Sequence, residues 1–200
     1  MFLPHASRLS GLLLDTAQVS VQDVNIVMEI AMDGTFAVLT FFLGMFDAYS
    51  DCKTGCLAKN EVQPRLSVSH GSLQFKGNDI GSETYIRYDT KHANGPYQTI
   101  VGASYSNLGD VWVGVGHSYT LALEDGGFFA EVHAMTGVYH HSGGPDLGGP
   151  IEFRSGAELG YRWDSGWRLG ASYDHRSNAE LFAQNPGVET VQIRLSVPIK

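Results

Sequence analysis

The sequence predicts an all-β protein, namely an eight-stranded antiparallel up-and-down transmembrane β-barrel. Its 200 residues include 24 glycines and 11% aromatic residues, a composition typical of turn-rich β structure. Beyond residue 60, apolar and polar residues alternate in short runs. Only 17% of the residues are charged, and no stretch reaches the about eighteen uninterrupted apolar residues of a membrane-spanning helix. Strands of a membrane barrel alternate in this way and lack such a stretch.

Eight strands are expected between turn-forming segments such as Ala93-Asn94-Gly95-Pro96 and Asp164-Ser165-Gly166. An even number of strands with no helical period between them favours a meander that closes on itself. The expected strands cover residues 62–75, 82–90, 97–106, 110–121, 127–140, 151–163, 166–177 and 188–199.

The alternation separates two faces in each expected strand. In 151–163, apolar residues such as Leu159 lie on one face, and charged residues such as Glu158 lie on the other. A soluble barrel or sandwich would bury the apolar face and expose the charged one. The charged face, however, also carries Gly156 and Gly160, as the crowded interior of a narrow barrel would require.

Aromatic residues favour the membrane barrel over the soluble one. Trp163 and Trp167 lie near strand ends, where membrane barrels carry an aromatic girdle. Inside such a barrel, Arg154, Arg162 and Arg168 are expected to neutralise carboxylates. Recognition of a lipid phosphate by these arginines would require them to reach the rim.

The net charge of −8, from 13 basic and 21 acidic residues, is the wrong sign for a nucleic-acid binder. The two cysteines, Cys52 and Cys56, are too few for a four-cysteine zinc site and have no histidine at ligand spacing. The sequence leaves open whether the two cysteines form a short local disulfide or stay as unpaired thiols.

The first fifty residues differ from the rest. Phe36 to Phe46 is an uncharged run of the length of a signal-peptide core, and Ala48-Tyr49-Ser50 offers small residues for cleavage. The basic segment that should precede such a core is missing. We therefore expect an atypical export signal or an overlong extension over 1–50, a linker with the cysteine pair over 51–61, and the barrel domain over 62–200.

Three polar residues break the two-face pattern near the ends of the last two strands. His175 and Ser177 share the apolar side of one strand, because residues i and i+2 point the same way. Glu189 extends the apolar side of the next strand. A nucleophile, a base and an orienting carboxylate are the parts of a serine hydrolase. The alternative is that strand ends simply become polar as they leave the membrane.

The segment Asp174-His175-Arg176-Ser177-Asn178-Ala179, followed by Asn185-Pro186-Gly187-Val188-Glu189, resembles the C-terminal motif of the PagL-type lipid A 3-O-deacylases. The family's spacing of twelve residues from serine to glutamate is kept. The sequence itself resembles the family over residues 156–199. Over residues 62–155, only the expected strand architecture does. The chain departs from many outer-membrane barrels in ending without a terminal aromatic residue.

This resemblance implies an esterase in the bacterial outer membrane, with its active site near the outer leaflet, that removes the 3-O acyl chain of lipid A. It implies that Ser177 is the nucleophile, His175 the base and Glu189 the orienting residue. Asn178 is the expected oxyanion donor, with help from a backbone amide of Ala179 or the loop glycine. No metal or cofactor is required, and the oligomeric state, a homodimer included, stays open.

A second hypothesis from another class is a non-catalytic outer-membrane barrel with a structural, adhesive or lipid-binding role. The two hypotheses differ in whether His175, Ser177 and Glu189 converge.

Overall fold

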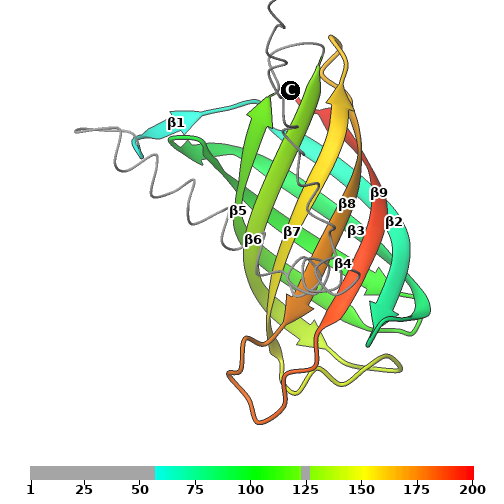
Figure 1. Cartoon of the computed structure of the whole chain (residues 1–200). Helices are drawn as coiled ribbons and strands as arrows, with labels where there is room; N and C mark the ends of the chain where they lie inside the picture. Colours follow the sequence, from blue (N-terminus) through cyan, green and yellow to red (C-terminus); the bar gives the residue numbers. More distant parts are fainter. Residues whose placement is uncertain (1–56, 123–126) are drawn as a thin grey trace, which may run out of the picture.

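The computed structural model describes residues 57–122 and 127–200 of the chain. These residues form strands only, and no helix among them is long and apolar enough to cross a membrane. Figure 1 shows the strands tilted around a common axis. They are β1 (Lys59–Glu61), β2 (Arg65–Phe75), β3 (Asn78–Asn94), β4 (Tyr97–Ser106), β5 (Val111–Ala122), β6 (Phe128–His140), β7 (Ile151–Arg162), β8 (Arg168–Ser177) and β9 (Val188–Pro198).

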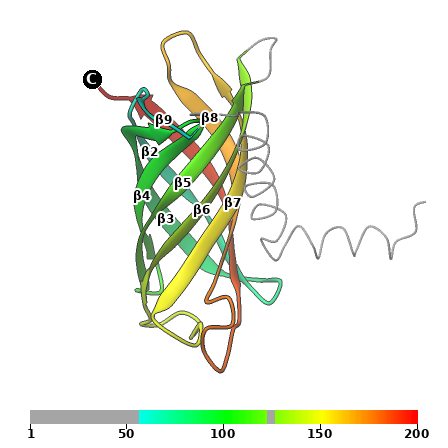
Figure 2. The ribbon, with the colours of Figure 1, turned by 90° about the vertical axis from the view of Figure 1, so that its left-hand side faces the viewer.

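Strands β2 to β9 form a closed antiparallel barrel, which confirms the predicted fold class. Each strand pairs with the next in the chain, and β9 returns to pair with β2 from Arg65↔Pro198 to Gln74↔Glu189. Figure 2 shows the barrel from a side turned by 90°. Closure pairs the backbone groups of every barrel strand on both sides, which a membrane-spanning sheet requires.

Two details of the strand prediction differ from the structure. Residues 59–61, expected within a linker, form β1 and pair with the end of β3 at Lys59↔Asn94. Strand β3, expected over 82–90, extends from Asn78 to Asn94 across register shifts in its pairing with both neighbours. The added residues are mostly polar and are held by backbone hydrogen bonds to neighbouring strands. Their side chains therefore lack the alternation on which the prediction depended.

The interior of the barrel is polar and charged. The fully buried Arg154 contacts Asp174 at 2.6 Å and Glu83 at 2.8 Å, and the buried Arg194 contacts Glu158 at 2.7 Å. The pairing of these buried charges offsets the large cost of removing them from water. The prediction that arginines neutralise interior carboxylates is confirmed for Arg154.

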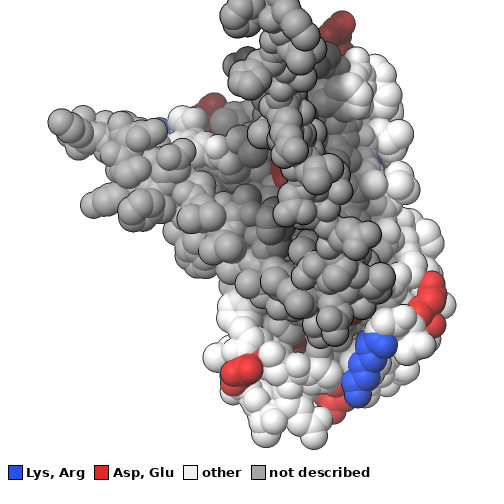
Figure 3. Space-filling model, viewed as in Figure 1, with Lys and Arg blue, Asp and Glu red and all other residues white. Residues whose placement is uncertain are grey.

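The outer wall of the barrel is apolar. Leu159 is 68% exposed, Val138 62% and Ile193 58%. Exposed large apolar side chains occur on every strand from β2 to β9, which is the arrangement of a barrel surrounded by lipid rather than by water. Where charged side chains are visible in Figure 3, they lie chiefly toward the two ends of the molecule.

Glycines make room for the buried charges, as predicted from the charged face. A Cβ atom at Gly170 would lie 2.4 Å from Glu158 Oε1, and one at Gly156 would lie 2.3 Å from Asp174 Oδ1. Any side chain at these positions would displace a carboxylate from its arginine partner.

The two ends of the barrel differ in the lengths of their connections. One end, here called the loop end, carries the two long connections 141–150 and 178–187 beside the shorter 76–77 and 107–110. The other, the turn end, carries short turns such as 95–96 and 163–167. Outer-membrane barrels place their longer loops outside the cell and their short turns in the periplasm.

Candidate active site

His175 and Glu189 lie side by side on the outer face of the barrel at the loop end. The register of β8 and β9 pairs the two residues directly, and His175 Nδ1 lies 3.2 Å from Glu189 Oε1. The two side chains are 13% and 12% exposed. The carboxylate can therefore accept a hydrogen bond from Nδ1–H, which leaves Nε2 as the basic nitrogen.

Ser177 is the last residue of β8 and follows His175 on the same face of the strand. Its register partner on the far side is Phe153 of β7. Within the described part of the chain, no hydrogen bond joins the Ser177 hydroxyl to the imidazole. Contacts of this kind in ligand-free sites often close only when substrate binds. The structure thus brings His175 and Glu189 into contact and places Ser177 two residues away on the same face.

Gly187 covers the His175 ring, a contact that sequence reasoning missed. A Cβ atom at Gly187 would lie 2.4 Å from His175 Cε1 and 3.1 Å from Nε2. The backbone of the 178–187 loop therefore packs directly on the imidazole. In the sequence, Gly187 is indistinguishable from an ordinary turn glycine after Asn185-Pro186.

Asn178, the expected oxyanion donor, is fully buried and joins two loops. Its Nδ2 donates hydrogen bonds of 2.6 Å to the carbonyls of Leu147 and Gln184, and its backbone N–H donates to Asn185 Oδ1 at 2.9 Å. Both hydrogens of the side-chain amide are therefore already donated in this arrangement.

The backbone after Asn178 is strained. Ala179 has a φ of 51° and Glu180 a φ of 62°, the left-handed conformation that residues other than glycine rarely adopt. Such strain persists only where the surroundings hold it. The hydrogen bonds of Asn178 and the bond from the Leu181 N–H to the Asn178 carbonyl provide that restraint.

The 141–150 loop supports the 178–187 loop through close glycine contacts. A Cβ atom at Gly149 would lie 2.1 Å from the Phe182 ring, and one at Gly148 would lie 2.0 Å from the Gln184 carbonyl oxygen. The start of the 141–150 loop is in turn held by Asp110, whose Oδ1 accepts hydrogen bonds from backbone N–H groups at 2.8 and 3.1 Å.

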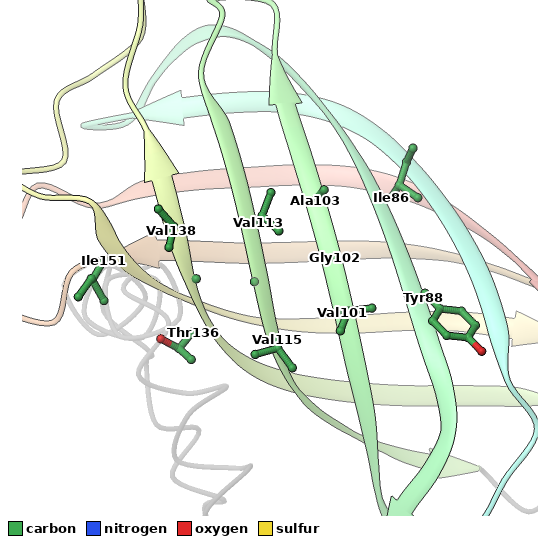
Figure 4. Close-up of a pocket in the computed structure, with 12 residues that line it drawn as sticks. Ile86, Tyr88, Val101, Gly102, Ala103, Val113, Val115, Thr136, Val138 and Ile151 are labelled. Carbon is green, nitrogen blue, oxygen red and sulfur yellow. The ribbon is translucent and has the colours of Figure 1, made fainter.

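An open apolar groove of about 800 Å³ follows the outer wall across β3, β4, β5 and β6 to the start of β7 (Figure 4). Thr136 at its edge pairs with Phe153, and Phe153 pairs with Ser177. Because Ile151 of β7 also lines the groove, the groove begins on the strand next to the one that carries the candidate nucleophile. Its other lining residues are Ile86, Tyr88, Val101, Gly102, Ala103, Val113, Gly114, Val115, Gly137, Val138 and Ile151.

The described residues contain no group of three or more side chains that could hold a metal ion. His133 and Glu131 are buried in the barrel interior, and His141 Nε2 lies 2.9 Å from the Gly144 carbonyl. The cysteine pair and the proposed export signal lie outside the described residues.

Comparison with known proteins identifies the family. The family model for lipid A 3-O-deacylase (PagL) matches residues 70–198. The chain belongs to the PagL family. The matched residues include His175, Ser177 and Glu189, and the family is one of lipid A-modifying enzymes of the bacterial outer membrane. No curated protein matches the chain.

Solved structures support the same fold for this PagL family member. The crystal structure of the outer membrane enzyme PagL is 17% identical, with a TM-score of 0.55 over 68% of this chain and 99% of that one. A de novo designed transmembrane β-barrel is 17% identical, with a TM-score of 0.51 over 68% and 95%. Neisserial surface protein A is 12% identical, with a TM-score of 0.50 over 71% and 99%.

Proposed function

We propose that this protein hydrolyses the ester that links the 3-O acyl chain to lipid A, using Ser177, His175 and Glu189 as a catalytic triad. The observation that carries this proposal is the 3.2 Å contact of His175 with Glu189, with Ser177 on the same outer face at the loop end. The match of the family model to this part of the chain supports the same reaction.

The place of these residues on the outer wall suits a substrate that arrives through the membrane. Lipid A is held in the outer leaflet by its acyl chains, so a site on the lipid-facing wall at the loop end meets the ester without removing it from the bilayer. The apolar wall that begins at Phe153 and continues into the groove offers acyl chains a surface along which to lie.

Each residue of the triad has one role in the reaction. His175 Nε2 accepts the proton of the Ser177 hydroxyl as Ser177 Oγ attacks the ester carbonyl. Glu189 accepts a hydrogen bond from His175 Nδ1–H and stabilises the positively charged imidazolium. His175 then gives its proton to the departing 3-oxygen of the glucosamine, which leaves as the hydroxyl while the acyl group stays on Ser177. A water molecule, deprotonated by His175, hydrolyses this acyl-enzyme and releases the fatty acid.

We assign Asn178 a positioning role. Its amide hydrogens hold the carbonyls of Leu147 and Gln184, and so fix the loop whose Gly187 packs on His175. The oxyanion donor is then a backbone amide of the same loop, from Ala179 or Gly187, aimed at the position where negative charge develops.

The direct test is mass spectrometry of lipid A from cells that express the protein or its Ser177→Ala variant. We expect the wild-type protein to remove one ester-linked chain and the variant to remove none. Ser165→Ala, in an exposed turn at the opposite end, is the matched control and should retain full deacylation. If Ser177→Ala deacylates lipid A normally, the triad is wrong. If the wild-type protein leaves lipid A intact, the chain is a non-catalytic barrel.

A further inference from the structure

The turn end carries a polar cavity of about 460 Å³, far from the triad. Strand β8 runs from Arg168 at this end to Ser177 at the loop end, so the two sites are separated by the length of a ten-residue strand. The cavity is lined by Arg65, Gly127, Arg162, Trp163, Asp164 and Gly166. Deacylation, as proposed above, gives this cavity no role.

Arg65 is a buried cation that is anchored by a carbonyl group. Its side chain is only 5% exposed, and one guanidinium nitrogen donates a 2.6 Å hydrogen bond to the Gly166 carbonyl. In the described part of the chain, no carboxylate forms an ion pair with it. A buried arginine normally has an anionic partner, because removing the charge from water is costly.

Arg162 and Arg168 oppose each other across the β7–β8 pair, and both continue the inward side of their strands. Like charges in this arrangement destabilise a sheet. Arg168 has one carboxylate contact, to Glu131 at 3.4 Å, and its Nε has no partner. Arg162 has no ion-pair partner among residues 57–122 and 127–200.

The nearby carboxylates are insufficient to balance these three arginines. Glu131 already contacts Arg87 at 2.5 Å, and Arg87 also binds Asp89. Asp164 lines the cavity and offsets part of the charge. Arg65 and Arg168 repel each other and are both repelled by Arg162, while Asp89 and Glu131, which already bind Arg87, attract both of them. An anion in the cavity would relieve that repulsion.

We propose that this cavity, at the turn end of the barrel, binds a phosphate group. Arginine guanidiniums present forked donors that match phosphate oxygens. Trp163 and Trp167, which are 44% and 47% exposed, place this rim at the depth of the lipid headgroups. A phospholipid headgroup of the inner leaflet and a free phosphate share the chemistry that the site recognises.

The test uses the full chain folded in a nonionic, phosphate-free detergent. Isothermal titration measures binding of inorganic phosphate and, separately, of phosphatidylglycerol in mixed micelles, with an uncharged diacylglycerol as the lipid control. Arg162→Gln is the test variant, because Arg162 is exposed and its replacement leaves the interior ion pairs intact. Lys76→Gln, an exposed cation beyond the loop end of β2, is the matched control.

We expect phosphate to bind the wild-type protein and Lys76→Gln equally, and Arg162→Gln roughly tenfold more weakly, as for the loss of one charge-assisted hydrogen bond. Binding of phosphatidylglycerol alone would identify the lipid as the source of the phosphate. Binding of neither probe, or equal binding by Arg162→Gln, would overturn the proposal. Deacylation is not measured, so these outcomes are independent of the proposed triad.

Discussion

The two ends of the barrel stabilise their polar groups in different ways. At the loop end, side-chain and backbone hydrogen bonds link the 141–150 loop through Asn178 to the loop that covers His175. At the turn end, Arg65 and Arg162 line a cavity whose one lining carboxylate is Asp164, and Arg168 lies opposite Arg162 on the next strand. The comparison indicates that the contacts at the loop end hold a fixed geometry, whereas the arginines at the turn end favour the binding of an anion.

The largest effect should follow from Glu189→Gln at the loop end. A glutamine amide can donate to His175 Nδ1 and so favour the tautomer in which Nε2 carries the proton and is no longer a base. We expect kcat for ester release to fall on the order of 10³–10⁴-fold, as in other triads whose orienting carboxylate becomes an amide. The rate of ester release from purified lipid A measures this fall. A fall of less than tenfold would remove Glu189 from the triad.

The wall between the two ends should tolerate charge less well than the turn-end rim. Ile193 lies within β9 and is 58% exposed, and Trp163 lies beyond the end of β7. Ile193→Arg should lower the free energy of unfolding in lipid vesicles by roughly 2–4 kcal/mol, and Trp163→Arg should lower it by about 1 kcal/mol or less. Folding yield from heat-modifiable gel mobility measures both. Equal effects would contradict the placement of β9 in the bilayer.

Gly187→Ala should change the geometry of the loop end without unfolding the barrel. A Cβ atom at this position would lie 2.4 Å from His175 Cε1, so either the ring or the loop must move. A displacement of this size can lower turnover on the order of 100-fold. We expect kcat to fall while heat modifiability is kept. Unchanged turnover would show that the 178–187 loop does not position the imidazole.

Asn178→Ala tests the connection between the two loops. The substitution leaves the carbonyls of Leu147 and Gln184 without their donor, and an unsatisfied buried group costs about 1–3 kcal/mol. We expect a roughly tenfold fall in kcat and faster proteolysis within 178–187. If turnover falls more than 1000-fold while the loop stays resistant to protease, Asn178 acts on the oxyanion directly.

The sequence predicted the barrel well because both of its signals are local. Alternation assigned the faces of the strands, and turn residues such as Asn94-Gly95 marked their ends. It also indicated that His175 and Glu189 lie on the same side at neighbouring strand ends, because the alternation places both on the outer face and the two strands follow each other in the chain. The fold prediction therefore needed no contact that is distant in the sequence.

The remaining features depend on contacts between loops. The packing of Gly187 on His175 and the bonds of Asn178 arise only when 141–150 and 178–187 meet. Arg162 looked like one more interior cation, because its strand parity matches that of Arg154. Only the structure shows that Arg154 contacts two carboxylates and that Arg162 lies at the rim of a cavity.

The smallest effect is expected from Gly95→Ala, the turn-end counterpart of Gly187→Ala. Gly95 connects β3 to β4 with a φ of 58°, and its N–H donates to the Ala58 carbonyl at 3.0 Å. Alanine can keep this left-handed conformation at a cost of about 1–2 kcal/mol. We therefore expect lower stability with unchanged kcat, the reverse of the pattern at Gly187. Urea unfolding in detergent and turnover of lipid A measure the two quantities. A loss of turnover in Gly95→Ala would show that the two ends of the barrel are coupled.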